Sequence, residues 1–100
     1  MKSGYRIHWS ERAVADMQGI IEYLLYQWTE REVRNFVQKL DKRLKLISIN
    51  PRLFPKTKER KNVRRSVLTK HIVIYYETAA DAIRIVTLFD TRQDPGKLNM

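Results

Sequence analysis

Cysteine is absent from the sequence, and glycine and proline occur only three times each among 100 residues. Without cysteine, neither a disulfide nor a thiolate metal site supports the fold. The sequence also lacks an apolar run of the roughly 18 residues that a membrane-spanning helix requires, and its first residues do not form the apolar stretch of a secretory signal peptide. We therefore expect a cytoplasmic protein that does not associate with membranes.

Negative charge is also scarce. The sequence has 20 Lys and Arg residues against 11 Asp and Glu, which gives a formal net charge of +9. Residues 51–70 hold eight of these basic side chains and a single acidic one. Because concentrated positive charge attracts polyanions, this distribution predicts association with nucleic acid, a ribosome or an acidic protein segment.

The length suits a single compact domain and excludes two independent cores.

The hydrophobic pattern of the first half predicts one strand and two helices. Residues 5–9 alternate between apolar and polar side chains, as in a strand with one buried face. Ser10 follows as a helix N-cap, and Thr29 with Glu32 three residues later forms a capping box. Apolar side chains then recur at helical spacing in two stripes, which are Val14, Met17, Ile21, Leu24 and Trp28, and Val33, Phe36, Val37, Leu40, Leu44 and Ile47. The sequence therefore predicts a long helical hairpin that ends at Asn50 and Pro51, since the residue before proline avoids the helical region.

The second half predicts a charged loop over residues 52–62 and then three strands. Val63–Leu68 alternates, whereas His71–Glu77 and Ile83–Phe89 are apolar on both faces, as in interior strands. The segments between them are short enough for antiparallel hairpins. The expected fold class is therefore α+β, in the order β-α-α-β-β-β, with an antiparallel sheet packed against the helical hairpin.

A cluster of basic side chains, here named the basic segment, is the strongest functional signal: Lys56, Lys58, Arg60, Lys61, Arg64 and Arg65. Strand alternation sends Arg64 and Arg65 to opposite faces of the sheet. Such a cluster suits nucleic-acid phosphates, each of which contributes about −0.9 to the slope of log affinity against log salt on duplex DNA. The alternative interpretation is a solvated loop that keeps the protein soluble.

Two residues near strand ends are candidates for acting on RNA. His71 begins the central strand and suits a general acid or base, because histidine exchanges protons near neutrality. The alternative is a histidine that only bonds the backbone. Arg92 follows the last strand and is placed to meet a phosphate, or instead to pair with Asp90 or Asp94.

Aromatic residues give a weaker signal. Tyr75 and Tyr76 are neighbours on a strand, so they face opposite sides of the sheet, and we consider Tyr75 for stacking on a base, with simple packing as the alternative. Trp9, Trp28 and Phe36 are interpreted as core anchors. The sequence contains no glycine-rich phosphate loop, zinc-protease motif or nucleophile elbow. We therefore expect no cofactor, and any catalysis should be free of metal.

The motifs together resemble the RelE/ParE superfamily, the toxins of bacterial type II toxin–antitoxin modules. The resemblance rests on the strand ending at Trp9, the helical hairpin, the "NPRLFP" loop, the "VRRSVLTKHIVIYY" strand pair and the closing "LFDTRQDP". It implies a growth-inhibiting toxin that a cognate antitoxin neutralises through an acidic or amphipathic tail.

The resemblance also implies two different mechanisms. RelE-like members cleave mRNA on the ribosome with basic residues on the sheet and a C-terminal aromatic or histidine, whereas ParE-like members lack that set and poison DNA gyrase. Arg65 and Arg92 stand at positions that resemble two of the RelE-like basic sites. Ile72 stands where a further arginine is expected, and Leu98 where the aromatic or histidine is expected.

Three hypotheses follow. The first is ribosome-dependent, metal-free mRNA cleavage, with Arg65 and Arg92 on phosphate, His71 as acid or base, and Lys56 and Lys58 in electrostatic docking. The second is a non-enzymatic inhibitor of DNA gyrase. The third is a basic RNA-binding domain without toxicity.

Overall fold

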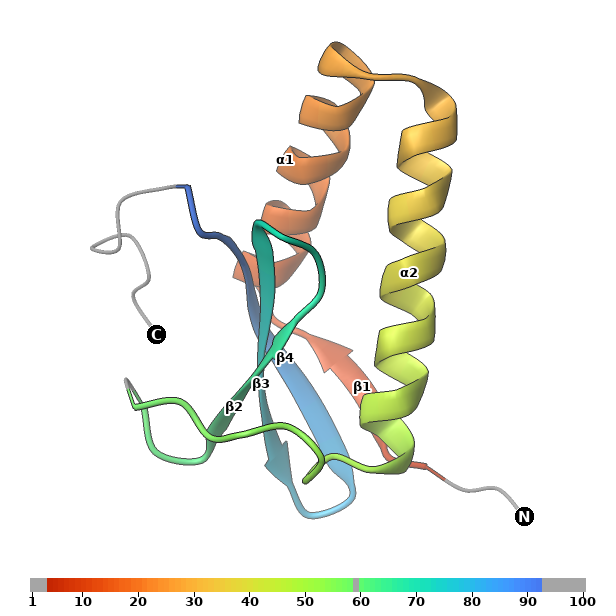
Figure 1. Ribbon diagram of the computed structural model, residues 1–100. Coiled ribbons are helices and arrows are strands. Elements are labelled where there is room, and N and C mark those ends of the chain that lie inside the picture. The colour runs from red at the N-terminus through yellow and green to blue at the C-terminus, as the bar shows by residue number, and fades with distance from the viewer. Residues whose placement is uncertain (1–3, 59, 93–100) are drawn as a thin grey trace.

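The computed structural model describes residues 4–58 and 60–92 as two layers, a pair of antiparallel helices lying on one face of a sheet (Figure 1). Along the chain the elements are β1 (Arg6–Trp9), α1 (Glu11–Gln27), α2 (Glu30–Ile49), β2 (Val63–Val67), β3 (Ile72–Ala79) and β4 (Ala82–Asp90). The predicted order and the α+β class are confirmed.

Both helix starts are capped as their sequence signals indicate. The Ser10 hydroxyl accepts a hydrogen bond from the Ala13 amide at 2.9 Å and donates one to the carbonyl of Val86 on β4 at 2.7 Å. Thr29 accepts a longer bond, of 3.4 Å, from the Glu32 amide. Ser10 therefore begins α1 and also ties it to the sheet.

The sheet has the order β1-β4-β3-β2, with β4 and β3 in the interior as predicted. β4 pairs antiparallel with β3, and β3 with β2. β1, however, runs parallel to β4, so the sheet is mixed and the expectation of a fully antiparallel sheet is wrong for this one pair. The physical reason is that β1 and β4 are not consecutive: both helices, β2 and β3 lie between them in the chain, so no tight hairpin forces the pair to be antiparallel.

The main core lies between the helices and the sheet. Phe36, Leu40 and Ile47 of α2 are buried there with Ala13 of α1 and with side chains from the central strands, namely Ile72, Ile74, Tyr76, Ile83, Ile85 and Leu88. A second buried cluster comprises Val63, Val73, Tyr75, Val86 and Phe89. Because side chains alternate along a strand, this second cluster belongs to the sheet face that points away from the helices.

Of the three predicted core aromatics, Phe36 is buried and Trp9 packs against the core, but Trp28 is 60% exposed. The prediction for Trp28 is wrong because this residue is the C-cap of α1, with φ −132° and ψ −153°. Its backbone has already left the helix, so helical spacing no longer decides which way its side chain points.

Candidate functional site

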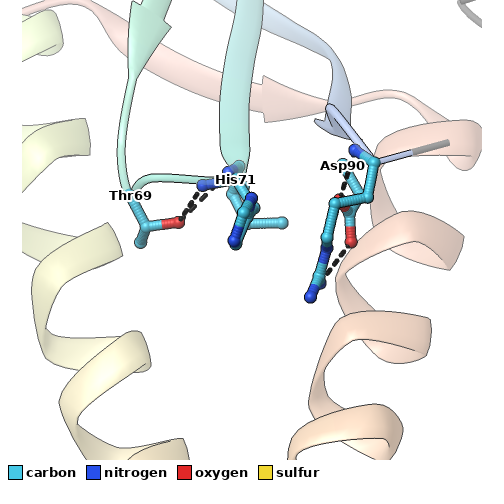
Figure 2. Close-up of polar contacts among 5 residues, drawn as sticks. Thr69, His71 and Asp90 are labelled. Carbon is cyan, nitrogen blue, oxygen red and sulfur yellow. Dashed lines mark hydrogen bonds and ion pairs between the residues drawn. The ribbon is translucent and has the colours of Figure 1, made fainter.

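A groove of about 720 Å³ lies between α1, α2 and the ends of β3 and β4. Figure 2 shows Thr69, His71 and Asp90 at this end of the sheet, with the His71 ring directed toward the space between the helices. The helices contribute apolar and aromatic walls, including Ile20, Tyr23, Leu24, Trp28 and Phe36. Charges of both signs also line the groove, the acids being Asp16, Glu32 and Asp90 and the bases Arg12, Lys39 and Arg92.

An ion pair between Asp90 and Arg92 forms the part of the groove nearest the end of β4. Asp90 accepts hydrogen bonds from Arg92 Nε at 3.0 Å, from Nη2 at 2.7 Å and from the Arg92 amide at 2.9 Å. The side-chain hydrogen bonds from Arg92 lower the pKa of Asp90, and the same bonds raise the pKa of Arg92. The guanidinium also lies 5.5 Å from the centre of the Tyr23 ring on α1.

The predicted alternative for Arg92, a salt bridge to Asp90, is therefore confirmed, and its contact with a phosphate stays a prediction. Asp94, the other carboxylate considered, lies outside the described residues. Leu98, which stands at the expected aromatic position, also lies outside them. The Arg92 charge is thus already partly neutralised by the protein itself.

His71 lies in the turn immediately before β3 rather than within the strand. The Thr69 hydroxyl accepts hydrogen bonds from the amides of His71 at 3.2 Å and Ile72 at 3.1 Å. The amide of Thr91, after β4, donates to the His71 carbonyl at 2.7 Å. These bonds fix the backbone on both sides of His71 and bring it into the same groove as Arg92.

Arg65, the third predicted catalytic residue, lies on a different face. It is opposite Tyr75 in the β2–β3 register, and Tyr75 belongs to the cluster on the sheet face away from the helices. Tyr75 itself is only 5% exposed, so its ring is packed and its predicted stacking on a base has no support from the structure. The structure therefore brings His71 and Arg92 together and places Arg65 apart from them.

The basic segment spans both faces of β2. Arg64 lies opposite Tyr76 on the helix-facing side, so the predicted divergence of Arg64 and Arg65 is confirmed. Arg60 pairs with Glu77 at 3.8 Å. The three lysines, Lys56, Lys58 and Lys61, are exposed.

Two residues that sequence reasoning missed hold the helices to the sheet. Asp16 of α1 accepts hydrogen bonds from the Thr87 hydroxyl and, at 3.2 Å, from the Leu88 amide. Arg43 of α2 donates to the Ser66 hydroxyl at 2.7 Å and to the Val67 carbonyl at 2.6 Å. A signal exists for Asp16, because an acid four residues before the core-packed Ile20 stands within an apolar stripe.

Within residues 4–58 and 60–92, no three His, Cys, Asp or Glu side chains gather closely enough to hold a metal ion. No helix in this part of the chain is both long and apolar enough to cross a bilayer.

Comparison with known families supplies the deciding observation. The model of the family described as "ParE toxin of type II toxin-antitoxin system, parDE" matches residues 7–95. The chain belongs to the ParE toxin family. Its predicted resemblance to the RelE/ParE superfamily is thereby confirmed.

Solved structures agree with the ParE fold. A chain from the chromosomal ParDE toxin–antitoxin system of P. aeruginosa matches with a TM-score of 0.73 and 16% identity, over 86% of this ParE-family chain and 95% of the other. A conserved hypothetical protein from Helicobacter pylori matches with a TM-score of 0.60 and 13% identity, over 89% and 97% of the two chains. At such low identity these likenesses establish the fold alone. No curated protein matches the chain.

Proposed function

We propose that this ParE-family chain stops bacterial growth by binding DNA gyrase, with no chemistry of its own. The observation that carries the proposal is the separation of Arg65 from His71 and Arg92 across the sheet. Metal-free cleavage of a phosphodiester needs proton-transfer groups and phosphate clamps around one phosphate. The three residues predicted for that task do not surround a common point.

The state of Arg92 supports the same conclusion. A phosphate clamp needs a cation whose charge is available, but Asp90 accepts both side-chain hydrogen bonds from this guanidinium. The charge-assisted pair is the stronger kind of hydrogen bond, and exchanging it for a phosphate leaves Asp90 beside the incoming anion. Arg92 therefore suits a shaped binding surface better than a catalytic clamp.

Ribosome-dependent mRNA cleavage is the second candidate. The observation that favours it is that His71 and Arg92 line the same groove. In that mechanism His71 exchanges the proton and Arg92 must first leave Asp90. Breaking the Arg92–Asp90 pair costs free energy that the gyrase-binding mechanism does not require.

We also propose a cognate antitoxin as partner, with the groove as its docking surface. Its apolar walls and mixed charges fit one face of an amphipathic segment, and the net charge of +9 favours an acidic one. The groove lies between elements that pack on a common core, which lowers the cost of ordering them on binding.

Induction of the chain in bacteria tests the proposal. Filamentation with a DNA-damage response, while transcripts stay intact, is the expected outcome. Translation arrest with transcripts cut on the ribosome would replace the proposal with the nuclease mechanism. Unaffected growth would contradict both mechanisms and leave a basic RNA-binding domain without toxicity.

A further inference from the structure

A second hollow, of about 350 Å³, lies at the opposite end of β2 and β3 from the groove. The described residues that line it carry three cations and two neutral polar groups, and none is a carboxylate: Arg52, Lys56, Asn62, Arg64 and Thr78. This hollow is named the cationic pocket. Its composition contrasts with the groove, where both signs of charge are present.

Glu77, the acidic residue of β3 next to the pocket-lining Thr78, is engaged elsewhere. Glu77 precedes Thr78 on β3, so its side chain points to the other face of the sheet. There it pairs with Arg84 at 3.2 Å and with Arg60 at 3.8 Å. The positive charge of the pocket is therefore not cancelled from β3.

The loop that supplies Arg52 and Lys56 is fixed to the sheet. Hydrogen bonds join residues 51–57 to β2 and β3. From side chains, Tyr76 Oη donates to the Pro51 carbonyl (2.7 Å), and Arg64 Nη1 donates to the Phe54 carbonyl (2.7 Å). Between backbone groups, the Arg65 amide donates to the Pro55 carbonyl (3.0 Å), and the Thr57 amide donates to the Val63 carbonyl (2.8 Å). The backbone of this site therefore needs little ordering when a ligand binds.

We propose that Arg52, Lys56 and Arg64 bind a phosphate group of a nucleic acid backbone. A guanidinium group can donate two parallel hydrogen bonds to two oxygens of one phosphate, and a lysine ammonium adds a compact positive charge. The Asn62 amide and the Thr78 hydroxyl supply neutral donors. The exposed Lys58 and Lys61 continue the positive surface along the loop, which favours a polyanion over a single free phosphate. The proposal does not depend on gyrase being the target.

The test compares the full chain with a variant that carries Arg52→Gln and Lys56→Gln. Arg64 is left in place because it bonds the Phe54 carbonyl. Affinity for a short fluorescently labelled DNA duplex is measured by anisotropy at several salt concentrations. We expect the variant to bind roughly tenfold more weakly at low salt, with a salt slope shallower by about 0.9 for each phosphate that the variant no longer neutralises. A control with the same charge change, Arg34→Gln and Lys42→Gln at exposed positions on α2, should keep the slope of the unmodified chain.

Two further measurements separate the sources of phosphate. Duplex added to the unmodified chain should shift the amide NMR signals of Asn62 and Thr78, and inorganic phosphate at equal phosphate concentration should shift them far less. Equal shifts from both ligands would assign the pocket to free phosphate and overturn the nucleic-acid proposal. An unchanged slope in the pocket variant, an equal weakening in the control, or shifts confined to other residues would also overturn it.

Discussion

Tyr76 shows how one side chain connects the core to a functional surface. Its ring is fully buried beneath the helices, and its hydroxyl donates to the Pro51 carbonyl, which precedes Arg52 of the cationic pocket. Burial raises the pKa of Tyr76 to about 12, against a smaller opposing effect from the charge of Arg64. The neutral phenol is therefore the form that the folded state stabilises.

The raised pKa of Tyr76 predicts a loss of stability in alkali. Because the folded-state pKa lies above the unfolded value of 10.0, the stabilisation is complete below pH 10 and disappears as the pH rises toward 12. Two pKa units correspond to roughly 2–3 kcal/mol of unfolding free energy. Urea unfolding across this pH range should show the decline, and Tyr76→Phe should lack that part of it. Parallel pH curves for the two proteins would contradict the prediction.

Arg92→Ala tests the groove at the level of one side chain. The substitution removes the bonds to Asp90 and the interaction with Tyr23, and so alters one wall of the groove, which we expect gyrase as well as the antitoxin to contact. Because Arg92 is exposed, we expect a stability cost of only about 0.5–1 kcal/mol with an unchanged circular dichroism spectrum. Toxicity on induction should fall. If the folded variant remains fully toxic, the groove is not the surface that acts.

For single residues, the sequence predicted contacts between neighbours in the chain but not contacts between distant residues. The pairing of Arg92 with Asp90 was anticipated because the two residues are close in the chain and opposite in charge. The position of Asp16 within an apolar stripe marks it as unusual, but its partners could not be anticipated, because they are on β4, 71 and 72 residues away. Such interactions depend on tertiary packing that local patterns do not contain.

Among the elements, the β3–β4 hairpin contains a local conflict. Ala79 pairs with Ala82, and Ala80 in the connection between them adopts a left-handed φ of 52°. Side chains with a Cβ disfavour this region, whereas glycine does not. We expect Ala80→Gly to raise the unfolding free energy by about 0.5–1 kcal/mol, measured by urea denaturation.

The neighbouring position provides the control for that substitution. Ala79 lies within β3, where glycine is expected to cost about 0.5–1 kcal/mol. An equal loss of stability in both variants would show that the backbone conformation at Ala80 is not the cause.

Element boundaries followed closely from caps, prolines and alternation, but side-chain direction in β4 did not. The β3–β4 register shifts at Tyr75 and Tyr76, which pair with Thr87 and Ile85 and leave Val86 without a partner in the ladder. As a result Leu88 faces the helices together with Ile85, where strict alternation would place Leu88 on the opposite face. A bulge of this kind arises from the pairing of two strands, so neither strand alone signals it.

At the scale of the whole molecule, the structure separates two surfaces. The groove lies near the β2–β3 turn, and the cationic pocket lies at the other end of these strands. The concentration of positive charge in residues 51–70 was evident from the sequence, as was the family likeness. The partition of the predicted catalytic residues between two sheet faces required the strand register.

This separation agrees with a toxin that acts by binding. A protein partner can contact apolar groove walls without any group transferring a proton, and a separate cationic surface favours association with a target that itself holds DNA. The same arrangement gives an endonuclease no single centre in which Arg65, His71 and Arg92 act on one phosphate.

A gyrase supercoiling assay with the purified chain tests this account most directly. We predict that the chain blocks supercoiling of a relaxed plasmid in proportion to its concentration, and that it leaves mRNA intact in a reconstituted translation mixture. Full gyrase activity in the presence of the chain, together with cleavage of ribosome-bound mRNA, would contradict the account.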